Sequence, residues 1–387
     1  MSRSASYARS SRLTRDGEGL ISGYGDYGLV AAVAAATTWI ATFVARRLAL
    51  RFSFVVAPDE RRVHEKPTPT LGGTAMYVGL LVAIVVASQL PGLSSLFRGS
   101  SDPLGVVVAA SIIFAVGAFD DVRDMSAPAK LSGQILAGLA LYLFGVNMLY
   151  FRTPFVGTVV LSNELVPILT VVWVVGMANS INLVDGLDGL AAGIVAIAAV
   201  AFFFYSEQLI KAGTIQPGSG PLFSALAAGI TIGFLPHNFH PARIFMGDAG
   251  ALLLGLLMAA STMSVVGQTD QDFSGRTFFF FAPVLIPFLI LGIPILDTAF
   301  AIVRRAGRRM NPAEADKNHL HHRLMRLGHG QTRSVLILWA WTALLSGLVL
   351  APSYVHGALG DVPFGIAVLA VALFTLVGVR GRSGSKA

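Results

Sequence analysis

Five aspartates on three stretches of the sequence are the residues whose types and spacing could do chemistry. Asp120 and Asp121 are adjacent at the end of one apolar segment, Asp185 and Asp188 lie three apart between two others, and Asp248 precedes a fourth. Adjacent carboxylates at the edge of hydrocarbon repel each other and are poorly solvated, which raises a pKa or recruits Mg²⁺. Because helix C-termini disfavour acids, Asp120 and Asp121 are expected to face a ligand. For Asp248, at the predicted start of a helix, capping is the alternative.

The stretch Met177–Gly193, MANSINLVDGLDGLAAG, adds Asn179 and Asn182 to the Asp185–Asp188 pair. The three-residue spacing places the two acids on one face if this stretch forms a helical turn. Carboxylates at the junction of two membrane-length segments are costly unless they bind a cation, a substrate or each other. A short polar loop without a function is the alternative.

Basic residues on neighbouring stretches could bind anions. His64 and Lys66 precede a turn rich in Pro, Thr and Gly, and Lys130 opens an apolar segment. A phosphate would suit Lys130, although a lysine that reaches to the membrane interface is an equal alternative.

Three histidines, His319, His321 and His322, lie in an arginine-rich stretch near the C-terminus. Three imidazoles could bind zinc, but among so many arginines we expect them to bind phosphate. An amphipathic helix at the membrane surface is the remaining alternative.

The composition indicates which elements position these groups. The chain is 54% hydrophobic and 13% charged, with a mean hydropathy of +0.70, which places it in the polytopic membrane class. It contains no cysteine, which excludes disulfides, thiolate metal sites and cysteine nucleophiles. We predict an all-α integral membrane protein with about eleven transmembrane helices, at approximately 28–44, 71–90, 104–119, 131–149, 165–181, 189–205, 220–236, 249–267, 277–303, 334–352 and 362–379.

The basic residues predict the orientation in the membrane. Of the 28 Lys and Arg residues, 20 fall in the loops after the odd-numbered segments and in the C-terminal tail, so these regions are expected to be cytoplasmic. The acid-bearing stretches fall in the same loops, which predicts an active site on the cytoplasmic face. We expect a disordered tail at 1–27, a transmembrane catalytic domain at 28–380 and a short basic cytoplasmic tail at 381–387.

Four motifs together resemble a known family. NSINLVDGLDGLAAG, the FDD that ends at Asp121, FMGDAG around Asp248, and HLHHRLMRLGH resemble the polyprenyl-phosphate N-acetylhexosamine-1-phosphate transferases. This membrane family includes the WecA type and the MraY type (phospho-MurNAc-pentapeptide transferase). The likeness covers all eleven predicted segments. It implies transfer of a sugar 1-phosphate from a UDP-sugar to a polyprenyl phosphate, with UMP as the other product.

The resemblance also implies roles for single residues. Asp248 looks like the main ligand of Mg²⁺ (or Mn²⁺), with Asp185 and Asp121 as further metal ligands and members of the catalytic centre. Asp120 resembles the acid that deprotonates the lipid phosphate, and Phe245 the ring that stacks on uracil. The remaining implied substrate-binding residues are Lys66, Lys130, Asn182, Asp188, Asn238, His319, His321 and His322.

Within the family, the WecA type fits better than the MraY type. The histidine stretch reads HLHHR, where the MraY type usually has three consecutive histidines, and Asp297 stands in ILDTAFAIVRR as in WecA-like members. The expected donor is therefore UDP-GlcNAc and the acceptor decaprenyl or undecaprenyl phosphate, in a bacterial inner membrane. No nucleic acid partner is expected; a homodimer is left open. The alternatives are an MraY-type enzyme and, from another class, a cation-coupled transporter.

Overall fold

The computed structural model describes residues 3–52, 55–56, 68–153, 157–213, 215–266 and 330–354, with short pieces between 366 and 373. The side chains are described from Tyr24 onward, except at 55–56, 151–153, 157–158, 348–349 and 351–354. Lys66, the three histidines at 319–322 and the predicted segment 277–303 lie outside the described residues, as does most of 362–379.

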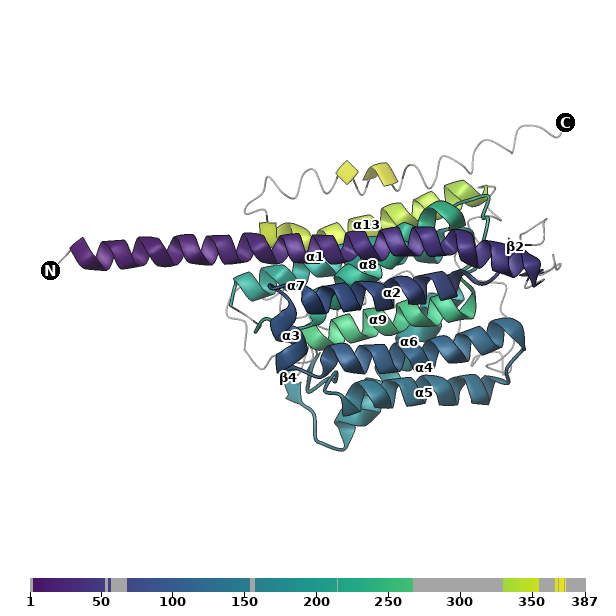
Figure 1. The fold of residues 1–387 in the computed structure, drawn as a ribbon, viewed down its shortest axis with the longest axis horizontal. Helices are drawn as coiled ribbons and strands as arrows, with labels where there is room; N and C mark the ends of the chain where they lie inside the picture. Colours follow the sequence, from purple (N-terminus) through teal and green to yellow (C-terminus); the bar gives the residue numbers. More distant parts are fainter. Residues whose placement is uncertain are drawn as a thin grey trace.

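The described part of the chain is a helical bundle with two short antiparallel strand pairs (Figure 1). Strand β1 (Val55–Val56) pairs with β2 (Thr68–Pro69), and β3 (Tyr150–Thr153) pairs with β4 (Gly157–Val160). The helices are α1 (Arg3–Arg51), α2 (Gly72–Gln89), α3 (Ser94–Gly99), α4 (Asp102–Val122), α5 (Ala127–Leu143), α6 (Leu165–Val184), α7 (Leu190–Lys211), α8 (Gly220–Asn238), α9 (Gly247–Val266) and α13 (Gln331–Tyr354).

Seven of the described helices are long and apolar enough to cross a membrane: Tyr24–Arg51 of α1, and α2, α4, α6, α7, α8 and α9. The predicted all-helical, multi-span architecture is therefore confirmed. The expected boundaries differ most at the first segment, predicted at 28–44 where the span is Tyr24–Arg51, and almost as much at the fourth segment, predicted at 131–149. There α5 begins at Ala127, and its 17 residues end at Leu143, because Gly145 at φ +96° and the β3–β4 hairpin follow.

The predicted tail at 1–27 overlaps the part of α1 whose side chains are not described, and only Tyr24–Arg51 of this helix qualifies as a span. The division of the chain into a tail, a catalytic domain and a short C-terminal tail stays a prediction.

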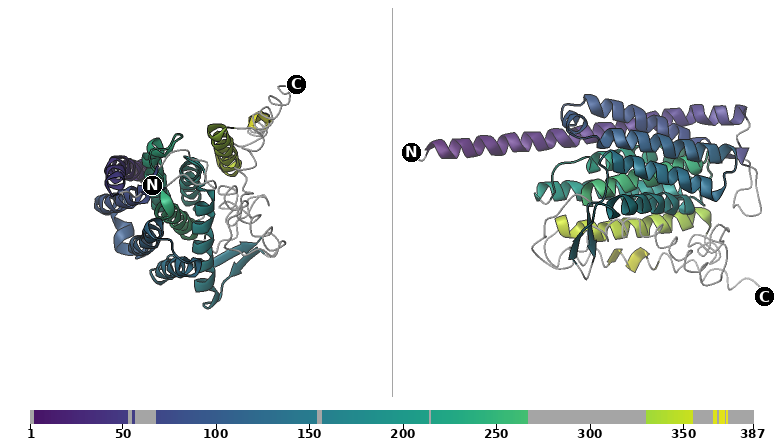
Figure 2. Two further views of the ribbon diagram at one scale, coloured as in Figure 1. Left: turned by 90° about the vertical axis from the view of Figure 1, so that its right-hand side faces the viewer. Right: turned by 90° about the horizontal axis from the view of Figure 1, so that it is seen from below.

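Helix α9 lies at the centre of the bundle, in contact with α2, α4, α6 and α8 (Figures 1 and 2). Its sequence is dominated by Ala, Leu, Gly and Met, and almost all of its side chains are buried. The small residues allow the neighbouring helices to approach α9 closely, and membrane helices associate mainly through such close packing. At Gly255 a β-carbon would meet the backbone of Ala178 on α6 at 2.4 Å.

The up-and-down course of the chain brings several helix ends to one end of the bundle. The C-termini of α4 and α6 and the N-termini of α5, α7 and α9 lie there, whereas the β3–β4 hairpin lies at the opposite end (Figures 1 and 2). All five predicted aspartates are therefore near the same end, as expected from the sequence.

Candidate active site

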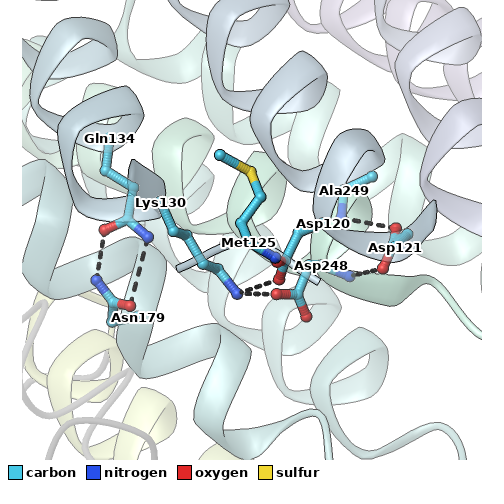
Figure 3. A network of polar contacts seen from close by, with 8 residues as sticks. All are labelled: Asp120, Asp121, Met125, Lys130, Gln134, Asn179, Asp248 and Ala249. Carbon is cyan, nitrogen blue, oxygen red and sulfur yellow. Dashed lines mark hydrogen bonds and ion pairs between the residues drawn. The ribbon is translucent and has the colours of Figure 1, made fainter. Parts of the chain in front are cut away.

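Lys130 lies between two of the predicted acids. Its ammonium Nζ is 3.0 Å from Oδ2 of Asp120 and also contacts Oδ2 of Asp248 (Figure 3). Asp120 lies in the last turn of α4, Lys130 in the first turn of α5 and Asp248 in the first turn of α9, so three helix ends meet at one cation. The side chains are 17%, 18% and 28% exposed, respectively. They are thus shielded enough for strong electrostatics and open enough to be reached by a substrate.

Asp121, the neighbour of Asp120, is directed at α9 instead. Its Oδ1 accepts a hydrogen bond from the backbone N–H of Asp248 at 2.7 Å, and its Oδ2 accepts one from the N–H of Ala249 at 3.1 Å (Figure 3). The first N–H groups of α9 are therefore capped by an acid, but this acid is Asp121 of α4 and not Asp248, as the capping alternative had it. The Asp248 carboxylate instead pairs with Lys130.

The second acid pair differs from the expected helical turn. Helix α6 ends at Val184 and α7 begins at Leu190, so Asp185 and Asp188 lie in a non-helical turn. Gly189, the residue before α7, adopts φ +74°, a left-handed conformation that favours glycine. Desolvation, together with the nearby carboxylates of Asp121 and Asp188, raises the pKa of Asp185 to about 7. Asp185 therefore faces the same charged region as Asp121.

Asp188 and Asn238 tie the turn before α7 to the loop after α8. Oδ2 of Asp188 lies 2.7 Å from Nδ1 of His240 and accepts the N–H of Ala242 at 3.0 Å. The Asn238 side chain accepts the N–H of Gly189 at 3.0 Å and donates to a carbonyl in the loop, that of Ile244, at 3.1 Å. These two predicted substrate-binding residues are 50 positions apart in the sequence, and Asn238 is bonded to the residue that follows Asp188.

The loop that carries Phe245 is also bonded to the entrance of α2. The Phe245 N–H donates to the carbonyl of Pro69 at 2.8 Å, and its carbonyl accepts the N–H of Gly72 at 3.0 Å. Phe245 is a partly exposed residue. Arg46, near the end of α1, donates from Nε to the carbonyl of Arg243 in the same loop at 3.3 Å.

Asn179 pairs with a residue that the sequence analysis missed. Its Nδ2 donates to Oε1 of Gln134 at 2.6 Å, and Nε2 of Gln134 approaches Oδ1 of Asn179 at 3.4 Å (Figure 3). Gln134 lies one helical turn after Lys130, a spacing of four that places both on one face of α5. This four-residue spacing from Lys130 was the feature of the sequence that could have indicated Gln134. Asn182 lies in the last turn of α6, partly exposed.

The donor set fits a hard divalent cation. No group of three or more His, Asp or Glu side chains converges on one metal position within the described ranges. However, Mg²⁺ is usually held by one or two carboxylates together with substrate phosphates and waters. Asp248 and Asp185 supply such oxygens, and Lys130 supplies a cation that can bind a phosphate. The arrangement can therefore bind and align phosphates at the end of the bundle.

Comparison with known proteins identifies the family. Residues 103–266 match the model of glycosyl transferase family 4. The chain is 38% identical over 369 residues to the decaprenyl-phosphate N-acetylglucosaminephosphotransferase of Mycolicibacterium smegmatis, covering 93% of this chain and 91% of that protein. It is 34% identical over 303 residues to the probable undecaprenyl-phosphate N-acetylglucosaminyl 1-phosphate transferase of Bacillus subtilis, covering 78% of each.

A more distant match is the phospho-N-acetylmuramoyl-pentapeptide-transferase of Desulforudis audaxviator, 32% identical over 331 residues, covering 78% of this chain and 90% of that protein. The higher identity to the N-acetylglucosamine transferases agrees with the resemblance seen in the motifs. The matched residues 103–266 contain Asp120, Asp121, Lys130, Asp185, Asp188 and Asp248. The chain is a multi-pass membrane protein that belongs to glycosyl transferase family 4.

Proposed function

We propose that this protein transfers N-acetylglucosamine 1-phosphate from UDP-GlcNAc to decaprenyl or undecaprenyl phosphate. The products are polyprenyl-diphosphate-GlcNAc and UMP, and the reaction is the first membrane step of a cell-surface polysaccharide. The observation that carries the proposal is the meeting of Lys130 with Asp120 and Asp248 at one end of a membrane bundle. The named relatives support the donor and the acceptor.

The chemistry requires two phosphates to approach each other. Asp120 is suited to accept the proton of the lipid phosphate, because its carboxylate is partly exposed beside Lys130. Lys130 is suited to bind a phosphate of the donor, since an ammonium neutralises the charge that accumulates there. Asp188 and Asn238 hold the loop that carries Phe245, which would stack on the uracil ring.

Asp248 and Asp185 would hold Mg²⁺ or Mn²⁺, which when bound would neutralise the diphosphate and polarise the bond that breaks. The metal requirement rests on the chemistry of these side chains. Lys66 and the three histidines at 319, 321 and 322 would add basic groups for the phosphates; these four residues lie outside the described part of the chain.

We also propose that the site lies on the cytoplasmic face of a bacterial inner membrane and that the whole chain has eleven spans. The positive-inside distribution supports this face, because the basic loops and the aspartates occupy the same predicted side. A lipid acceptor explains why phosphate chemistry takes place at the end of a transmembrane bundle.

The test is direct. Purified protein is incubated with radiolabelled UDP-GlcNAc, decaprenyl phosphate and Mg²⁺, and radioactivity in the lipid phase is measured with and without a chelator. The expected result is lipid-linked label that depends on both the acceptor and the metal. Label that enters the lipid phase only with UDP-MurNAc-pentapeptide would assign the MraY-type reaction, and ion uptake into vesicles without any transfer would support a transporter.

A further inference from the structure

The neighbouring acids Asp120 and Asp121 serve different helices. Successive residues on a helix point about 100° apart, so one carboxylate reaches Lys130 while the other reaches the N-terminus of α9. Each oxygen of Asp121 accepts one backbone N–H, from Asp248 at 2.7 Å and from Ala249 at 3.1 Å (Figure 3). Asp120 accepts Lys130 Nζ and, at 2.7 Å, the N–H of Met125.

Helix α9 has no capping side chain of its own. The first N–H groups of a helix lack partners inside the helix and are usually satisfied by an oxygen on the preceding side chain. Here the helix begins at Gly247 after Met246, and neither side chain has an oxygen. The cap is instead supplied from α4, 127 residues earlier. A carboxylate also matches the positive end of the helix dipole.

The packing around this contact leaves room only for the carboxylate. Gly247 adopts φ +66°, and a β-carbon there would lie 2.4 to 2.7 Å from the Asp121 carboxyl atoms. On α4, a β-carbon at Gly117 would lie 2.5 Å from the Ala249 backbone. Gly117 is one helical turn before Asp121, so the same face of α4 meets α9 at both positions. The backbones of α4 and α9 therefore approach each other closely here, and the two hydrogen bonds of Asp121 join them.

We propose that Asp121 is a positioning residue that caps α9 and thereby directs the Asp248 carboxylate toward Lys130, rather than a ligand of Mg²⁺. The role given to Asp248 rests on the proposed function. Both oxygens of Asp121 already accept backbone hydrogen bonds. One of these bonds comes from the N–H of Asp248, whose own side chain contacts the ammonium of Lys130. The two adjacent acids that follow Phe119 thus have different roles. Asp120 faces the substrates, and Asp121 fixes the N-terminus of α9.

Amide hydrogen exchange in metal-free protein separates the two roles. We expect Asp121→Asn, measured in chelator, to speed exchange at the N–H groups of Asp248 and Ala249 by roughly 3- to 30-fold, the loss typical of a helix cap. Asparagine keeps the shape but turns one acceptor into a donor. The matched control Asp120→Asn should leave these amides unchanged. A metal ligand would affect exchange only in the presence of Mg²⁺, so unchanged exchange in chelator overturns the proposal.

A second variant keeps both carboxylates. Gly247→Ala places its β-carbon against Asp121 and should reproduce the faster exchange at Asp248 and Ala249. For Asp121→Asn we also expect kcat to fall while KM for polyprenyl phosphate changes less than about twofold, because Asp248 is misplaced but the acceptor site is intact. Thermal unfolding of each variant in detergent identifies any that fail to fold. If the wild-type protein transfers no sugar phosphate, the proposed function fails, whereas the exchange result still decides the role of Asp121.

Discussion

Lys130 contacts the carboxylate of Asp248 although the two residues are 118 positions apart in the sequence. The contact joins the first turn of α5 to the first turn of α9, beside Asp120 in the last turn of α4. A cation shared by two acids is held in place before any substrate binds. Such preorganisation is the main electrostatic contribution that proteins make to phosphoryl transfer.

We expect Asp248→Asn to reduce turnover by about a thousandfold or more, because it removes an anionic oxygen that would hold the divalent cation. Lipid-linked radiolabel measured at increasing Mg²⁺ checks this. Folding should be preserved, since the backbone N–H of Asp248 keeps its hydrogen bond to Asp121. Wild-type rates at ordinary Mg²⁺ would exclude Asp248 as the main ligand.

Asp120→Asn should slow turnover roughly a hundredfold, the low end of a general-base contribution. The substitution keeps the shape of the side chain and an oxygen for the N–H of Met125. Initial rates with saturating UDP-GlcNAc and polyprenyl phosphate give the measurement. Full activity in this variant would show that another group accepts the lipid-phosphate proton.

For Lys130→Met we expect kcat/KM for the donor to fall by about 100- to 1000-fold, because a charged group that faces the developing phosphate charge is lost. Lys211→Met is the matched control. Lys211 ends α7 at the opposite end of the bundle, with its ammonium 4.6 Å from the ring centre of Tyr24, and its removal should leave kcat/KM unchanged. Equal losses in the two variants would indicate a general effect of charge removal rather than a role for Lys130 at the site.

Gln134 and Asn179 should behave as a coupled pair. Each single substitution to Leu leaves one amide without its partner and should lower the free energy of unfolding by about 1–3 kcal/mol. The double variant should lose less than the sum, with a coupling of roughly 0.5–2 kcal/mol. Denaturant unfolding in detergent provides the four values. Additive losses would mean that the hydrogen bonds between these side chains do not stabilise the contact of α5 with α6.

His321→Ala and His322→Ala are expected to raise KM for UDP-GlcNAc, since imidazoles can donate hydrogen bonds to its diphosphate. No zinc should be present in the purified wild-type protein, because the arginine-rich stretch repels a free cation and attracts a diphosphate. Elemental analysis and donor titrations provide the measurements. Stoichiometric zinc that disappears in both variants would contradict the phosphate role.

The sequence alone determined the membrane class, most helix boundaries and the family. Long apolar segments can only be helices in lipid, because every backbone polar group must be satisfied internally. The alternation of polar loops also predicted that Asp120, Asp185 and Asp248 lie at one end of the bundle, since successive spans reverse direction. These inferences depend on local composition and on chain direction, which the sequence contains.

Only the tertiary structure decided which group each acid contacts. Adjacent residues such as Asp120 and Asp121 have the same local pattern, and their partners, Lys130 and the N-terminus of α9, depend on how α4 packs against α5 and α9. The same holds for Gln134, a polar residue in an apolar segment whose partner Asn179 lies on another helix. Helix packing is fixed by side-chain shape over long sequence separations, and a spacing rule within one helix carries no information about it.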